Sequence, residues 1–157
     1  MARRRSWVFL AYRLPREPST PRIAVWRKLR ALGVAQVLDG LAALPHSSRN
    51  RERLEWLAED VTEADGEASI WIARSATAAQ ERVMVERMAA AVGEEYRAVT
   101  VMAEHAAAGE PPGRRRALRR LRRQMQRIRQ RDYFPPPERE MAAEAIGRLA
   151  ELGKVRS

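Results

Sequence analysis

Short apolar runs alternate with helical stripes along the first 73 residues of the chain. The run from Trp7 to Tyr12 is rich in β-forming residues and predicts a strand buried on both faces. Two shorter runs, 34–38 and 41–44, flank the pair Asp39-Gly40, which is a strong local signal for a β-hairpin. Residues 67–73 predict a fourth strand.

Two helical patterns separate these strands. We expect Thr20 to cap the first helix, Pro21 to take its first position and Gly33 to end it, while Ser48 caps the second. The apolar positions expected to face inward are Ile23, Val25, Trp26 and Leu29 in the first helix and Leu54, Leu57, Ala58 and Val61 in the second. The order βαββαβ predicts an α+β fold with a ferredoxin-like core.

Beyond this core the pattern becomes entirely helical. The expected elements are a capping box at 77–80, a helix to about His105 that Gly93 kinks or splits, a linker at 109–113, a helix at 114–131, a proline break at 135–137 and a last helix at 138–152. We therefore expect a core at 1–75 and a helical extension at 76–157, together forming one compact domain.

The helix at 114–131 contains ten arginines and no acid. Its charge of +10 therefore equals the net charge of the whole chain. Leu118, Leu121, Met125 and Ile128, with Ala117 beside them, recur at the spacing of one helical stripe. Arg122 and Arg129 flank that stripe. The arginines expected on the opposite face are Arg115, Arg116, Arg119, Arg120, Arg123 and Arg127.

Guanidinium groups match phosphate geometry well, so a nucleic-acid backbone is the leading partner for this face. The candidate nucleic-acid-binding residues are Arg115, Arg116, Arg119, Arg120, Arg122, Arg123 and Arg127. Two other interpretations stay open: an acidic partner or small oxyanion, and a plain solvated face. The acidic partner could be the chain's own segment 31–110, whose seven basic and fourteen acidic residues give a net charge of −7. Arg3, Arg4 and Arg5 form a short basic arm that could reach the same phosphates.

Composition narrows the remaining classes of function. A length of 157 residues with 45% hydrophobic and 32% charged residues fits a soluble globular protein, and no apolar run is long enough for a membrane span. The absence of cysteine excludes disulfides and thiolate metal sites and favours a cytoplasmic location. His46 and His105 lack zinc-binding spacing, so no metal, cofactor or catalytic residue is expected. The four tryptophans are expected to form one core cluster, with base stacking as the alternative.

Three stretches of the sequence resemble one family. They are WVFLAYRLPREPSTPRIAVWRKLRALG near the N-terminus, then DGLAALP, then ERLEWLAEDVTEADGEASIW; the EEY at 94–96 and the RQRDYFP at 129–135 add to them. Together they are similar to the N-terminal domain of the ChrB-type chromate-resistance regulators, over nearly the whole chain.

The resemblance implies DNA binding and chromate-responsive control of transcription in bacteria, and we expect a homodimer on double-stranded DNA. Longer members carry a second, C-terminal domain, so DNA binding without a chromate response is also open. Any chromate effector would have to bind arginines, because the chain has no thiol to reduce it. The fold is also similar to that of phenylacetate-type repressors and of a small metal-dependent nuclease. Those nucleases have an acid at the end of the first strand, where this chain has Arg13, so we expect no enzyme and keep a metal-dependent nuclease-like protein as the less favoured alternative.

Overall fold

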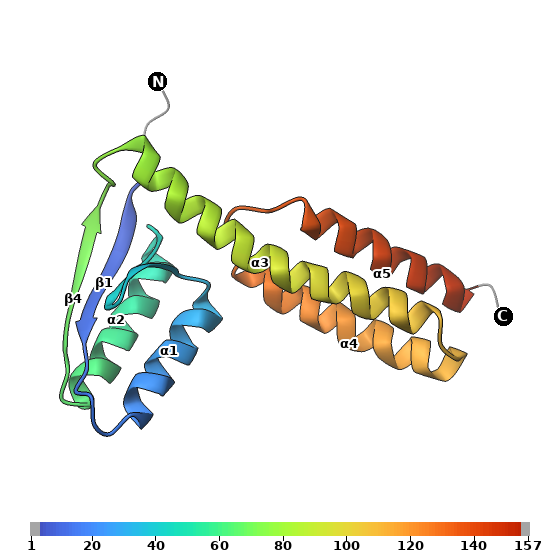
Figure 1. Cartoon of the computed structure of the whole chain (residues 1–157), viewed down its shortest axis with the longest axis horizontal. Coiled ribbons are helices and arrows are strands. Elements are labelled where there is room, and N and C mark those ends of the chain that lie inside the picture. The colour runs from blue at the N-terminus through green and yellow to red at the C-terminus, as the bar shows by residue number, and fades with distance from the viewer. Residues whose placement is uncertain (1–3, 155–157) are drawn as a thin grey trace. The chain divides into compact units, whose positions relative to one another are not determined.

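The computed structural model describes residues 4–154, which form four strands and five helices (Figure 1). In chain order these are β1 (Trp7–Arg13), α1 (Thr20–Leu32), β2 (Ala35–Leu38), β3 (Leu41–Pro45), α2 (Ser48–Glu63), β4 (Glu67–Ala73), α3 (Ala78–Ala107), α4 (Pro111–Gln130) and α5 (Glu138–Lys154). The chain divides into two compact units, unit 1 (Met1–Met88) and unit 2 (Ala89–Ser157), and α3 contributes residues to both. The predicted boundary between the core and the helical extension, after residue 75, stays a prediction.

The sheet of unit 1 has the strand order β2-β3-β1-β4, and every neighbouring pair is antiparallel. This confirms the α+β, ferredoxin-like arrangement, including the hairpin at Asp39-Gly40. Gly40 is required at that turn because its φ is +80°, and a Cβ atom there would lie 2.6 Å from the carbonyl oxygen of Tyr12. The backbone N–H of Tyr12 donates to the Gly40 carbonyl over 2.8 Å, which ties the hairpin to β1.

Helices α1 and α2 lie side by side, and α2 packs across β1 and β4 (Figure 1). The core of unit 1 includes Val8, Leu10, Leu44, Val25, Leu29, Leu54, Leu57 and Val61. Both predicted caps were wrong by one residue. Ser19 precedes α1 without a side-chain cap, and the Ser47 hydroxyl accepts the N–H of Asn50 over 3.0 Å at the start of α2. Gly33 ends α1 in the left-handed conformation, as predicted.

The prediction of a tryptophan core cluster was wrong. Trp7 is fully buried, but Trp26, Trp56 and Trp71 are 52%, 58% and 61% exposed. Ile23, also expected inside, is 46% exposed, because α1 buries the stripe through Val25 and Leu29 instead. Unit 1 therefore leaves large apolar side chains on its surface.

Helix α3 begins with the predicted capping box. The Gln80 N–H donates to the Thr77 hydroxyl over 3.1 Å, and the Thr77 N–H donates to the Gln80 side-chain oxygen over 3.3 Å. The first turns of α3 are joined to β1 because the Trp7 indole N–H donates to Glu81 over 3.1 Å. Gly93 was expected to kink or split the helix, but α3 continues through it to Ala107.

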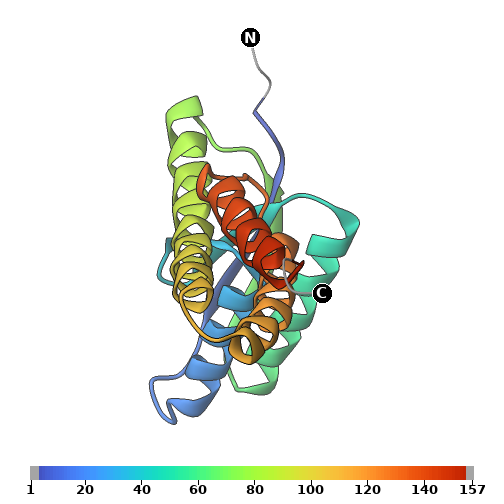
Figure 2. The same ribbon diagram turned by 90° about the vertical axis from the view of Figure 1, so that its right-hand side faces the viewer.

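Unit 2 is built from the second half of α3 together with α4 and α5, which lie side by side (Figure 2). Its core residues are Val92, Tyr96, Val99, Ala103, Ala117, Leu121, Met125, Ile128, Ala142, Ala145, Ile146 and Leu149. Helix α4 starts at Pro111, inside the expected linker, because proline suits the first helical position. Among the described residues, no helix combines the length and apolar character needed to cross a bilayer.

Candidate nucleic-acid interface

Helix α4 places its apolar and basic residues on different faces, as its sequence predicts. Ala117, Leu121, Met125 and Ile128 are buried, and Leu118 is half-buried against the same core. Residues of α3 and α5 share this core and cover the inner side of α4. Its outer side is free to carry charge.

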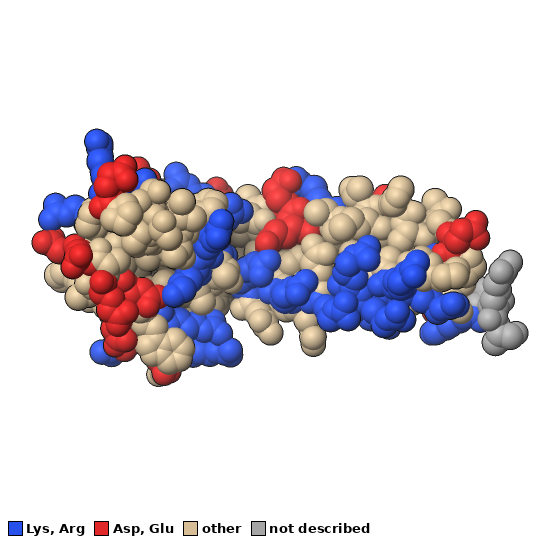
Figure 3. All heavy atoms as spheres, turned by 90° about the horizontal axis from the view of Figure 1, so that it is seen from below, with Lys and Arg blue, Asp and Glu red and all other residues tan. Residues whose placement is uncertain are grey.

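All seven candidate arginines, together with Arg129, are exposed. Figure 3 shows basic side chains gathered along α4 with few acidic ones among them. Within residues 89–154, no carboxylate forms an ion pair with these eight side chains. Concentrated positive charge without internal neutralisation attracts polyanions. The exposed members are Arg115, Arg116, Arg119, Arg120, Arg122, Arg123, Arg127 and Arg129.

The two ends of the basic run differ from its middle. Arg131 faces Glu95 of α3 in a bidentate ion pair, with Nη2–Oε1 at 2.5 Å and Nε–Oε2 at 3.1 Å. Arg114 is partly buried, and its Nε has no hydrogen-bond partner among the described atoms. Arg131 therefore connects helices within unit 2, whereas the middle of the run is available to a ligand.

Arg122, Arg123 and Arg129 line a groove of about 460 Å³ on unit 2. Its other lining residues are Met125, Gln126, Ala143 and Ile146. The placement agrees with the prediction that Arg122 and Arg129 flank the packed stripe. The groove combines cationic and apolar lining, so it suits an anionic group attached to an apolar one.

A polar cluster in unit 2 was not predicted from the sequence. The Tyr96 hydroxyl donates to Oδ2 of Asp132 over 2.7 Å, and Arg139 lies 3.5 Å from the same oxygen. Both Tyr96 and the Asp132 side chain are fully buried. Burial, followed by the hydrogen bond to Asp132, raises the pKa of Tyr96 well above its usual value. The cluster joins α3 to the segment after α4, so its evident role is to hold the arginine helix in place.

Two of the stretches that carry the family resemblance meet in this cluster. Glu95 and Tyr96 come from the EEY, and Arg131 and Asp132 come from the RQRDYFP. Their pairing brings the two separated motifs into contact within unit 2. The signal in the sequence is the order of the residues. Glu95 precedes Tyr96, and their partners Arg131 and Asp132 follow one another in the same order.

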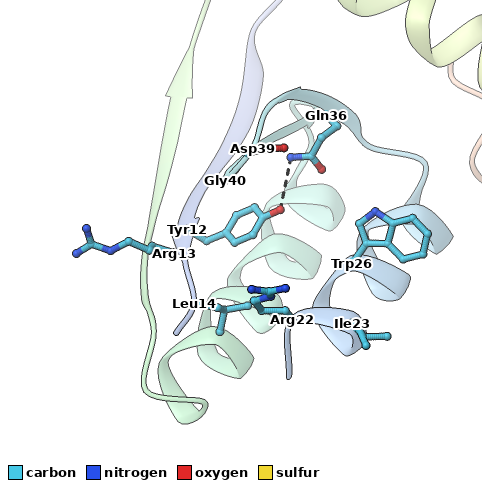
Figure 4. Close-up of a pocket in the computed structure, with 9 residues that line it drawn as sticks. All are labelled: Tyr12, Arg13, Leu14, Arg22, Ile23, Trp26, Gln36, Asp39 and Gly40. Atoms are coloured by element: carbon cyan, nitrogen blue, oxygen red, sulfur yellow. Dashed lines mark hydrogen bonds between the residues drawn. The ribbon is translucent and has the colours of Figure 1, made fainter. Parts of the chain in front are cut away.

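A second cavity lies in unit 1, with a volume of about 670 Å³ (Figure 4). Tyr12, Arg22, Trp26 and Gln36 line it, and the Gln36 amide donates to the Tyr12 hydroxyl over 3.4 Å. Arg13 points away from these residues in Figure 4 and pairs with Glu67 over 2.7 Å. Arg22 forms no ion pair among residues 4–88, so its guanidinium group is available to hold a small anion in this cavity.

The remaining candidate groups do not extend either site. Arg3 lies outside the described residues, Arg4 is exposed, and Arg5 is tied to Glu81 through its backbone N–H over 3.0 Å. The short basic arm is thus partly engaged within unit 1. Across residues 4–154, no three His, Cys, Asp or Glu side chains are grouped so as to hold a metal ion.

Comparisons with known proteins agree on one family. The family model described as "Protein ChrB, N-terminal" matches residues 22–105. The chain is 36% identical over 67 residues to Protein ChrB of Cupriavidus metallidurans, an alignment that covers 43% of this chain and 20% of that protein. The chain thus matches about a fifth of the length of this curated relative. No solved structure matches the chain significantly.

Proposed function

This chain belongs to the ChrB family, and from that premise we propose that it is a DNA-binding regulator of transcription linked to chromate resistance. The family membership agrees with the resemblance predicted from the sequence motifs. In this proposal the protein acts in the cytoplasm, as a homodimer, on double-stranded DNA. The exposed arginines of α4 hold the phosphate backbone.

The observation that supports the proposal most is the unneutralised basic face of α4. Its seven candidate arginines extend along one helix and have no carboxylate partner among residues 89–154. Such a face gives affinity through phosphate contacts, which carry no sequence information by themselves. Recognition of a particular operator would need base contacts in addition.

One observation favours an alternative, a module that binds an acidic protein segment. The groove lined by Arg122, Arg123 and Arg129 also has apolar lining from Met125 and Ile146, which are 5% and 8% exposed. An amphipathic segment with acidic and apolar residues would satisfy both kinds of lining. Duplex DNA would use the arginines and leave this apolar lining uncovered.

A salt titration of duplex binding tests the proposal. Each phosphate contact releases counterions, so log K falls with log salt by about 0.9 per contact, and about five contacts per protomer contribute about −4.5 to the slope for each protomer. Replacing Arg116, Arg119 and Arg123 together by glutamine is expected to flatten the slope by about two to three units per protomer. The fold is expected to survive because all three side chains are exposed.

The matched control replaces Arg27, Arg49 and Arg82, which are also exposed and form no ion pair among residues 4–88. The net charge changes equally in both triple variants. The proposal requires that only the α4 variant flattens the slope. An unchanged slope in the α4 variant would place the DNA-binding surface elsewhere, and tight binding of an acidic peptide without duplex binding would support the alternative.

A chromate response, if the chain has one, is proposed to be simple binding of the dianion to arginines. Sulfate has the same charge and a similar shape, so we expect sulfate at equal ionic strength to reproduce any effect of chromate on DNA affinity. The measurement is DNA affinity with chromate, with sulfate and with a chloride control. An effect of chromate that a large excess of sulfate leaves unchanged would show that this binding mode is wrong.

A further inference from the structure

The two edges of the sheet in unit 1 differ in their protection. The edge strand β2 has only four residues, and its pairing with β3 shifts register between Gln36 and Leu38. Arg87 also donates to the carbonyl oxygen of Gln36 over 3.4 Å. A short, irregular strand with an occupied carbonyl is a poor template for pairing with another strand.

The opposite edge strand, β4, has none of these protections. Its seven residues pair with β1 in one unbroken register, and it contains no proline, lysine or bulge. Among residues 4–88 no strand pairs with its outer side. Trp71 and Ile72 are 61% and 47% exposed there. Long, regular and apolar edge strands of this kind pair readily with other chains.

We propose that β4 is the dimer interface, where a second copy of the chain adds its own β4 antiparallel to the first. The two four-stranded sheets would then form one sheet of eight strands. A two-fold axis perpendicular to the sheet keeps each side chain on the same face of the sheet in both copies. Directly opposed residues must also share a face, so the axis has to lie between the two copies of one residue. An axis at Ile70 pairs all seven residues of the strand.

Side-chain sizes and charges favour this register. Across the axis Trp71 lies opposite Ser69 of the second copy, and Ile72 lies opposite Ala68, so these two large side chains face small ones, while Ile70 meets Ile70 of the second copy. Glu67 begins the strand and Arg74 follows it. An antiparallel arrangement brings the acidic end of one strand to the basic end of the other, whereas a parallel one brings like charges together.

Cysteine crosslinking tests the register directly, because the natural chain contains no cysteine. Directly opposed residues of an antiparallel pair have Cα atoms about 4.5–5.5 Å apart, within the range of a disulfide. Under mild oxidation Ile70→Cys is expected to form a covalent dimer. The control, Leu38→Cys, lies at the protected edge and is 66% exposed; it is expected to stay monomeric on denaturing gels.

A second variant tests the interface without a covalent crosslink. Ile72→Lys places a charge on the edge and is expected to raise the dimer dissociation constant about tenfold or more in sedimentation experiments. Val101→Lys, at an exposed apolar position of α3, is the control and should leave the constant unchanged. Circular dichroism verifies that both variants fold.

Two outcomes would overturn the proposal. One is a parent chain that sediments as a monomer at every concentration. The other is a dimer that Ile72→Lys leaves intact and Ile70→Cys does not crosslink. Neither experiment contains DNA, so failure here is distinguishable from failure of the proposed DNA-binding function.

Discussion

Arg131 and Arg123 carry the same guanidinium group eight positions apart on one basic run, yet their surroundings differ. The Arg131 side chain is 22% exposed and forms a bidentate ion pair with Glu95, whereas Arg123 is exposed and has no acidic partner in the described part of unit 2, residues 89–154. A substitution at each position should therefore change a different property. Composition alone treats the two residues as equivalent.

Arg131→Gln is expected to lower the free energy of unfolding by about 1 kcal/mol, because it removes a partly buried pair. It should leave the slope of DNA affinity against salt nearly unchanged. Arg123→Gln should do the reverse, with stability unchanged and the slope flatter by about one unit. Urea unfolding and salt titration of both variants check this, and equal stability losses would show that the pair with Glu95 contributes nothing.

Tyr96→Phe is expected to destabilise the protein by about 1–2 kcal/mol at neutral pH, because buried Asp132 loses a hydrogen-bond donor. The raised pKa of Tyr96 means that the folded chain keeps this proton above pH 10 while the unfolded chain loses it. The stabilising effect of the tyrosine thus declines by roughly 1.4 kcal/mol per pH unit above about 10. Urea unfolding at rising pH should show the two proteins converging; a constant difference would contradict this.

At the scale of elements, periodicity predicted the strands and helices but left one ambiguity in α1. Two stripes share Leu29: one runs through Ile23 and Trp26, the other through Val25. The structure buries the second stripe, and the choice depends on packing against α2 rather than on sequence spacing. The same limit of sequence spacing explains which parts of the candidate nucleic-acid interface were predicted and which were not. The basic face of α4 follows from spacing, whereas the Tyr96–Asp132 contact joins residues 36 positions apart and needs the fold.

Glycine substitutions distinguish a turn from a helix. Gly40→Ala is expected to destabilise the hairpin by roughly 1–3 kcal/mol, because of its positive φ and the Tyr12 carbonyl 2.6 Å from the new Cβ. Gly147→Ala in α5 meets no atom within 4 Å and should stabilise unit 2 by up to about 1 kcal/mol. Thermal unfolding of both variants gives the comparison, and a neutral Gly40→Ala would show that the turn can relax.

At the scale of the whole molecule, two cores are connected through a single helix. In the described part of unit 2 twelve buried residues form a hydrophobic core, and this unit bears the arginine face, while unit 1 bears the proposed dimer edge. The proposed DNA-binding surface and the proposed dimer interface therefore belong to different units of the chain. This separation allows the two to be studied apart.

A fragment of residues 78–157 is expected to fold as a helical bundle and to remain monomeric, because it lacks β4. Its salt slope for duplex binding should be about half that of the dimeric chain, since one basic face replaces two. Circular dichroism, sedimentation and salt titration measure the three properties. A fragment that is unfolded, or one that dimerises, would show that the two parts depend on each other more than their separate cores imply.

The placement of aromatic residues gives each unit its own optical signal. All four tryptophans lie at or before residue 71, within unit 1, so indole fluorescence follows that unit alone. Tyr96 is buried in unit 2 and resists ionisation while its hydroxyl is bound to Asp132. At alkaline pH, phenolate absorbance from this residue should therefore emerge only as unit 2 opens. Unlabelled protein thus reports which of its two cores unfolds first.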